Sequence, residues 1–79
     1  MVTKSLLSLG EGDTARVGTL QIAGLTRRRL LDLGFTPGAH VQCLFSAPSG
    51  SPRAYMIRGT VIALRSGDAE NITVSEVEA

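Results

Sequence analysis

Residues 27–38 read Arg-Arg-Arg-Leu-Leu-Asp-Leu-Gly-Phe-Thr-Pro-Gly, and they decide the fold because a helix, its end and a chain reversal follow one another directly. Apolar residues recur at helical spacing from residue 22 to residue 33. Gly34 comes directly after them and suits the left-handed conformation that ends many helices. Pro37 and Gly38 suit the two central positions of a type II turn. The stretch therefore predicts a short helix that stops at Gly34, followed by a sharp turn into a strand.

The helical spacing also predicts which side chains of this segment meet the core. Arg27 and Arg28 lie outside the apolar arc of the helix, and Leu31 falls on its far side among polar neighbours. At about 100° per residue, the arc itself holds four apolar residues and one arginine: Ile22, Leu25, Leu30, Leu33 and Arg29. We expect the Arg29 guanidinium to tie the helix to the sheet, because an arginine in an apolar arc must find acceptors for its N–H groups.

Outside the helix, the chain has the pattern of short strands separated by turns. Apolar and polar residues alternate over 14–19, 40–45 and 71–74, and the apolar runs 53–58 and 61–64 lie between turn residues, so each of the five runs predicts one strand. In the second of these runs, the alternation places Val41, Cys43 and Phe45 on one face. Residues 1–9 are predicted as a short ordered arm, and 65–69 as a connector of one turn.

Turn residues between the strands complete the fold prediction. Residues 48–52 read Pro-Ser-Gly-Ser-Pro and predict the tip of a long hairpin, and Gly59 predicts a tight turn. Five short strands with one early helix are typical of a small barrel, because closure leaves few exposed strand edges. We therefore predict a single domain over residues 1–79, mainly β with one short helix, folded as a small five-stranded SH3-like barrel.

Composition excludes several classes of function. Eight basic residues against seven acidic ones leave a net charge of +1, far from the positive field that nucleic-acid binding requires. The single Cys43 cannot form an internal disulfide, and no long apolar signal segment follows Met1, so we expect a cytoplasmic protein. No apolar run approaches the roughly 18–20 residues that span a bilayer, so any membrane connection is expected to go through a partner.

The residues that could carry chemistry do not form a convincing site. His40 and Cys43 are good metal ligands, but residues three apart in a strand point to opposite faces. We therefore predict neither a metal site nor a cofactor. The chain has one histidine and lacks the constellation that nucleophilic catalysis needs, so we expect no enzymatic activity.

The remaining candidates are residues for protein recognition. Leu31 and Phe35, with Leu25 as a further member, could form an apolar surface patch, and the outward arginines Arg27 and Arg28 lie on the same helix. Arg28 can also pair with Asp32 four residues later. The hairpin tip adds further candidates: Pro48, Ser49, Gly50 and Pro52. Structural roles are predicted for seven residues: Arg29, Leu30, Leu33, Gly34, Pro37, Gly38 and Gly59.

Taken in order, several segments closely resemble the FeoA family: residues 30–38, 47–52, 57–59, 61–65, 68–69 and 72–74. The match runs over roughly residues 5–75. The resemblance implies an SH3-like cytoplasmic accessory protein of bacterial ferrous iron transport. It also implies a partner, FeoB, a membrane permease with a cytoplasmic GTPase domain that would recruit the protein to the inner face of the membrane. Ser51 departs from the family, which often has Asp before the proline that is Pro52 here.

Other interpretations stay open at this point. The same fold forms the C-terminal domain of iron-dependent repressors similar to the diphtheria toxin repressor, so a stand-alone interaction module of that kind is one alternative. Others are a small RNA-binding barrel, a polyproline reader, direct Fe(II) binding through His40 and Cys43, and self-association as a homo-oligomer. The three scattered aromatic residues argue against the RNA and polyproline alternatives, because both need aromatic platforms.

Overall fold

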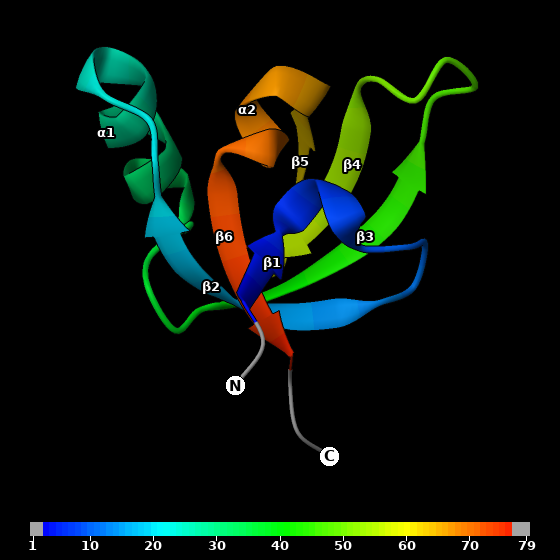
Figure 1. The fold of residues 1–79 in the computed structure, drawn as a ribbon, viewed down its shortest axis with the longest axis horizontal. Helices are drawn as coiled ribbons and strands as arrows, with labels where there is room; N and C mark the ends of the chain where they lie inside the picture. Colours follow the sequence, from blue (N-terminus) through cyan, green and yellow to red (C-terminus); the bar gives the residue numbers. More distant parts are fainter. Residues whose placement is uncertain (1–2, 77–79) are drawn as a thin grey trace.

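The computed structural model describes residues 3–76 and shows strands that surround one apolar core, with a short helix at one side (Figure 1). In chain order the elements are β1 (Thr3–Ser5), the 3-10 turn η1 (Leu6–Ser8), β2 (Thr14–Leu20), α1 (Gly24–Leu33), β3 (His40–Ser46), β4 (Arg53–Ile57), β5 (Thr60–Leu64), α2 (Ser66–Glu70) and β6 (Ile72–Glu76). The structure thus confirms the prediction of a mainly β fold with one short helix.

The strands form one antiparallel sheet in the order β1-β6-β2-β3-β4-β5. Within residues 3–76 the sheet does not close, so β1 and β5 are its two edges. The prediction of five strands missed β1, because a three-residue strand is too short to show alternation. β1 forms where β6 offers an edge, with Lys4 opposite Val74. α2, a five-residue helix, replaces the predicted connector.

The core lies inside the curved sheet and draws on every strand from β2 to β6. Ala15, Val41 and Tyr55 are examples of its fully or almost fully buried side chains. The whole cluster consists of Leu6, Leu9, Ala15, Val17, Leu30, Phe35, Val41, Cys43, Tyr55, Ile57, Ile62, Leu64, Ala69, Ile72 and Val74. η1 closes one end of the barrel, since Leu6 and Leu9 belong to this cluster.

The end of α1 is a Schellman motif, as a helix that stops at a left-handed glycine often is. Gly34 has a φ of 118°, its N–H donates to the Leu31 carbonyl at 3.1 Å, and the Phe35 N–H donates to the Leu30 carbonyl at 3.0 Å. The apolar residue after such a glycine packs back toward the last turn, and Phe35 is fully buried with Leu30 in the core. The prediction that Phe35 lies in a surface patch is therefore wrong.

The turn that follows confirms the second half of the sequence prediction. The Ala39 N–H donates to the Thr36 carbonyl at 3.0 Å, across Pro37 and Gly38. Gly38 has a φ of 87°, as the third position of a type II turn requires. Its N–H donates to the Val17 carbonyl at 2.7 Å, which fastens the turn to β2.

α1 departs from the predicted orientation. It begins at Gly24, and Leu30 is its one buried residue. Leu25 is 89% exposed and Leu33 is 38% exposed, so the prediction that both face the core is wrong for Leu25 and only partly met by Leu33. Arg29 is exposed and makes no hydrogen bond or ion pair with the described residues, so it does not tie the helix to the sheet as predicted. The helix contacts the small barrel along one narrow line, which leaves the rest of its apolar arc uncovered.

Two strand predictions also change. Phe45 is 57% exposed, although alternation placed it on the same face as Val41 and Cys43. The register between β3 and β4 shifts between Cys43 and Phe45, and this irregularity turns the later side chain outward. β4 ends at Ile57, because Arg58 with a φ of 48° and Gly59 with a φ of 77° form the two-residue turn to β5.

Candidate docking site

A groove of about 440 Å³ separates α1 from the corner where β5 runs into α2. The helix contributes Thr26, Arg29, Leu30 and Leu33, and the opposite wall consists of Ile62, Ala63, Leu64, Arg65 and Asp68. The groove forms because α1 reaches the core only through Leu30. Its lining combines apolar side chains with three charged ones, Arg29, Arg65 and Asp68, a composition that suits a binding groove.

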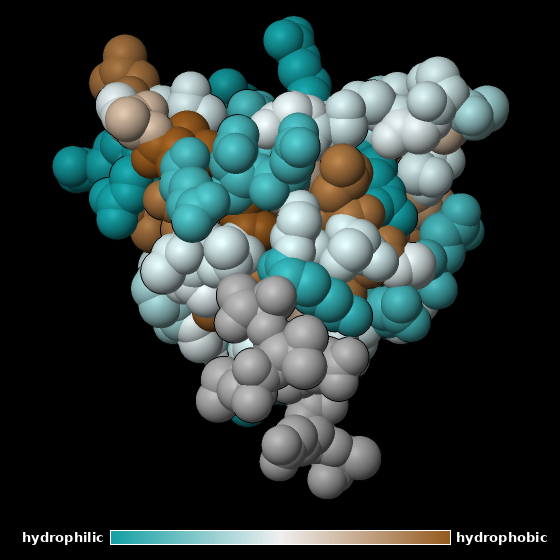
Figure 2. Space-filling view, viewed as in Figure 1, coloured by the Kyte–Doolittle hydropathy of each residue, from teal (hydrophilic) through white to brown (hydrophobic). Residues whose placement is uncertain are grey.

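Exposed apolar side chains lie on both of the elements, α1 and β5, that border this groove. Leu25 and Leu33 lie on α1, and Val61, on β5, is 55% exposed. Figure 2 shows hydrophobic side chains reaching the surface over α1, next to hydrophilic ones. A single exposed leucine would need no explanation, but several beside a groove are typical of a protein interaction surface.

The charges near the groove are mainly positive. Arg28 pairs with Asp32 at 3.6 Å, as predicted, but both side chains are exposed and such a pair contributes little to stability. Arg27 is exposed on the same helix. The guanidinium groups of Arg29 and Arg65 stand on opposite walls of the groove, and neither makes an ion pair or hydrogen bond with residues 3–76. The groove therefore offers two guanidinium groups to a partner.

The structure separates the residues that the sequence proposed as one recognition surface. Leu31 is half-buried on α1. Pro48, Ser49 and Gly50 lie at the exposed β3–β4 tip, on the opposite side of the molecule from α1 (Figure 1). Pro52 lies at the base of this loop, which is held by a hydrogen bond from the Ala47 N–H to its carbonyl at 3.0 Å. Sequence reasoning missed the β5–α2 wall, since no local pattern shows that β5 is an edge strand.

A polar cluster around the half-buried Arg53 is structural. The Arg53 guanidinium donates to the Leu7 carbonyl, to the Leu9 carbonyl at 2.6 Å, and to the Cys43 Sγ at 3.4 Å. Its Cζ lies 6.0 Å from the centre of the Tyr55 ring. This one side chain joins η1 to β3 and β4. It fastens η1, whereas the role that the sequence assigned to Arg29 was to join the helix to the sheet.

The other candidate ligands do not come together. His40 is exposed and Cys43 is fully buried, as expected for residues three apart in a strand. Across residues 3–76, His, Cys, Asp and Glu form no group of three or more that could hold a metal ion. In the same part of the chain, no helix is long and apolar enough to cross a membrane.

Because the Cys43 thiol is buried, the free energy of unfolding changes with pH in the alkaline range. Burial raises the pKa of Cys43 above its ordinary value of 9.0, although the Arg53 charge opposes the shift. As pH rises, the Cys43 thiol therefore loses its proton in the unfolded chain before it does so in the folded one. The folded state is stabilised fully below the pKa of the unfolded thiol, and this stabilisation is lost as pH rises toward the pKa of the folded thiol. Burial raises the pKa of Tyr55 in the same way.

We expect the free energy of unfolding, measured in urea, to fall between about pH 8 and pH 10. A Cys43→Ala variant should be less stable at neutral pH yet lose less stability over this range, because only the Tyr55 part remains. Equal losses in the variant and the wild type would show that the thiol does not contribute.

Comparison with known proteins agrees with the fold and the motifs. The model of the FeoA domain matches residues 4–76. The FeoA protein from Chlorobium tepidum, known from its solution structure, is 36% identical with a TM-score of 0.89, and the match covers 94% of this chain and 70% of that one. A comparison with curated protein sequences finds no significant match.

Two further structures extend the comparison. FeoA from Stenotrophomonas maltophilia, solved with zinc, is 29% identical with a TM-score of 0.77, covering 90% of this chain and 88% of that one; it is described as a prokaryotic SH3 domain protein and a candidate activating factor of ferrous iron transport. A manganese-dependent transcriptional repressor shares the fold at 20% identity and a TM-score of 0.83, over 95% of this chain and 42% of that one. The chain, with its SH3-like fold, its Schellman-ended helix and a domain match over nearly its whole length, belongs to the FeoA family, which is associated with ferrous iron transport.

Proposed function

We propose that this protein is a non-enzymatic accessory of bacterial ferrous iron transport that docks on FeoB, a permease with a cytoplasmic GTPase domain, and assembles or regulates it. Membership of the FeoA family supports the transport role. One observation carries the docking role: Leu25 is 89% exposed on α1, the helix that forms one wall of a groove that the molecule does not fill itself. The protein would work in the cytoplasm and reach the membrane through this partner.

The docking surface consists of the exposed leucines of α1, Leu25 and Leu33, and the groove between α1 and β5. Complete burial of one leucine stabilises a contact by about 1.5–3 kcal/mol, so Leu25 is large enough to serve as an anchor. Leu33 and Val61 extend the apolar surface. The surface differs from the one expected from sequence, because Phe35 belongs to the core and the Pro48–Pro52 loop lies far from α1.

A Leu25→Asp variant tests the surface. We expect binding to purified FeoB in nanodiscs to weaken at least about tenfold, since an apolar anchor becomes a carboxylate that must stay hydrated. The fold should be unaffected, because the side chain is 89% exposed.

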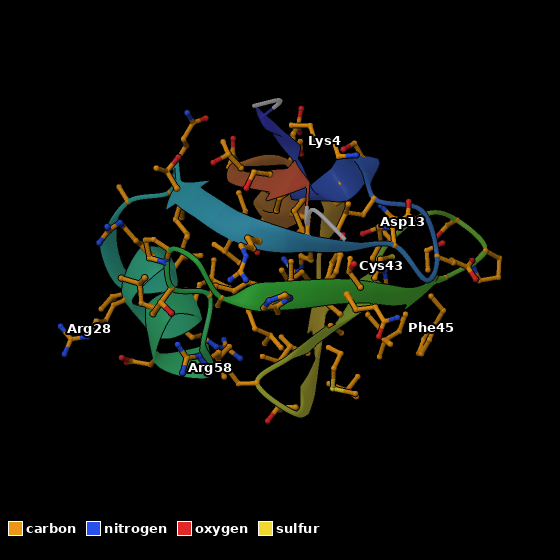
Figure 3. The ribbon with its side chains drawn as sticks, turned by 90° about the horizontal axis from the view of Figure 1, so that it is seen from below. Lys4, Asp13, Arg28, Cys43, Phe45 and Arg58 are labelled. Atoms are coloured by element: carbon orange, nitrogen blue, oxygen red, sulfur yellow. The ribbon has the colours of Figure 1, made fainter. Side chains whose placement is uncertain are left out.

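Phe45→Asp is the matched control. Phe45 is also an exposed large apolar residue, but Figure 3 shows it at the opposite end of the molecule from Arg28 of α1. Its change should leave FeoB binding within about threefold of the wild type. Wild-type binding by Leu25→Asp, or equal losses in both variants, would refute the α1 surface. No binding of the wild-type protein to FeoB would refute the proposed function.

A further inference from the structure

We propose that the groove between α1 and β5 receives an extended segment of the partner, which adds to β5 as a further strand and places carboxylates against Arg29 and Arg65. This inference rests on the proposed docking function and names how the partner is recognised. β5 ends the order of the sheet, so its outer edge pairs with no strand among the described residues. Ala63 and Leu64 of this strand line the groove.

The register of the β4–β5 hairpin identifies which backbone groups face outward. Arg58 and Gly59 both have positive φ, as in the type I′ turn of a two-residue hairpin. Such a turn closes on a hydrogen-bonded pair, here Ile57 with Thr60, and hydrogen-bonded pairs alternate along an antiparallel ladder. The N–H and C=O groups of Val61 and Ala63 therefore point away from β4, and no residue from 3 to 76 pairs with them.

The groove lies where an added strand would run. Strand spacing in a sheet is about 4.8 Å, so a segment paired with Val61 and Ala63 would lie between β5 and α1. Its side chains on one face would meet the α1 wall, where Leu33 is the exposed apolar residue. Ala63 is small and exposed, so it leaves the approach to the edge open. Main-chain pairing of this kind supplies affinity, while the side-chain contacts select the partner.

The charges that line the groove determine which side chains the partner segment should carry. Arg29 and Arg65 border it from opposite walls and have no partner within the described chain, whereas Asp68 is the one acidic residue that lines it. Unpaired guanidinium groups bind carboxylates well, because their N–H groups match both oxygens. The expected ligand is thus an extended segment of FeoB with acidic residues and at least one apolar side chain.

Two kinds of variant test this mode of binding with FeoB in nanodiscs as the probe. Ala63→Pro removes an outward N–H and blocks pairing, while proline is tolerated at such a position of an edge strand. We expect at least about tenfold weaker binding. Arg29→Glu should weaken binding about tenfold as well, whereas Arg27→Glu, the same change on the same helix outside the groove, should stay within about threefold.

Amide hydrogen exchange of the wild-type protein tests strand addition without relying on the folding of the Ala63→Pro variant. In the wild-type protein, the Val61 and Ala63 amides should exchange at least about tenfold more slowly when FeoB is bound. Strand addition to β5 would be overturned if FeoB left the exchange rates of the Val61 and Ala63 amides unchanged and Ala63→Pro bound FeoB with wild-type affinity. In that case, weaker FeoB binding by Leu25→Asp would still support the docking function. A wild-type protein that binds no FeoB would overturn both. If the wild-type protein forms a dimer that the Ala63→Pro variant does not form, the outer edge of β5 pairs with a second copy of this chain. That result would overturn FeoB as the partner of this edge.

Discussion

An Arg53→Met variant is expected to lose about 3 kcal/mol of unfolding free energy, because two backbone carbonyls lose their charged donor. Hydrogen bonds to charged groups contribute about 1.5–3 kcal/mol each, and Arg53 donates to the carbonyls of Leu7 and Leu9. A domain of this length has roughly 4–12 kcal/mol in total. Loss of this side chain would therefore detach η1 from β3 and β4 and remove a large fraction of the stability.

Urea unfolding followed by far-UV circular dichroism measures this loss. Arg53→Lys should recover part of it, since an ammonium keeps the charge but not the fork that reaches two carbonyls. Arg27→Met makes the same chemical change at an exposed arginine and should cost less than about 0.5 kcal/mol. Equal stability of Arg53→Met and Arg27→Met would show that the Arg53 contacts do not hold η1.

Gly34→Ala is expected to destabilise the fold by about 2–3 kcal/mol. Part of the cost is the backbone, because a φ of 118° is strained for any residue with a Cβ. The rest is crowding, because the new Cβ would lie 2.9 Å from the Arg58 Cδ. Movement of Arg58 would lengthen its hydrogen bonds to the Gly34 carbonyl at 3.4 Å and to the Thr36 Oγ1 at 2.9 Å.

The same substitution at two other glycines separates the cost of backbone strain from the cost of crowding by Arg58. Gly24→Ala has a positive φ of 71° but open space around the Cβ, so it should show the backbone cost alone. Gly67→Ala, in α2, has neither problem and should be neutral or slightly stabilising. Thermal unfolding resolves the series, since 1 kcal/mol shifts the Tm of such a domain by about 4–8 °C. A Tm for Gly34→Ala at or above that of Gly24→Ala would show that crowding by Arg58 adds nothing.

Much of the fold follows from local chemistry. Gly34 and the Pro37-Gly38 pair have conformational preferences that hold in any surroundings, and both took the predicted geometry. Alternation placed β2, β3 and β6, because a strand half-covered by a core must alternate, and turn residues on either side of two apolar runs placed β4 and β5. The β1 strand was missed, since its three residues gain their structure from pairing with β6 rather than from their own pattern.

The candidate site was much less predictable. The pattern of α1 marked an apolar arc correctly but could not show that the barrel is too small to cover Leu25. Phe35 was placed on the surface because the Schellman contact with Leu30 depends on where the helix ends against the core. The β3 irregularity likewise turned Phe45 outward. The edge of β5, and hence the groove, depends on the strand order of the whole sheet.

By itself, the sequence determined the order of the elements, the stop and turn between residues 34 and 38, and the resemblance to one family. These depend on the torsional preferences of glycine and proline and on periodicity, which act over a few residues. The tertiary structure alone decided that Arg53 fastens η1 to β3 and β4 while Arg29 stays exposed, and that α1 and the edge of β5 enclose a groove. Contacts between residues distant in sequence depend on packing, because only packing determines which arginine finds carbonyl acceptors and which apolar face stays uncovered.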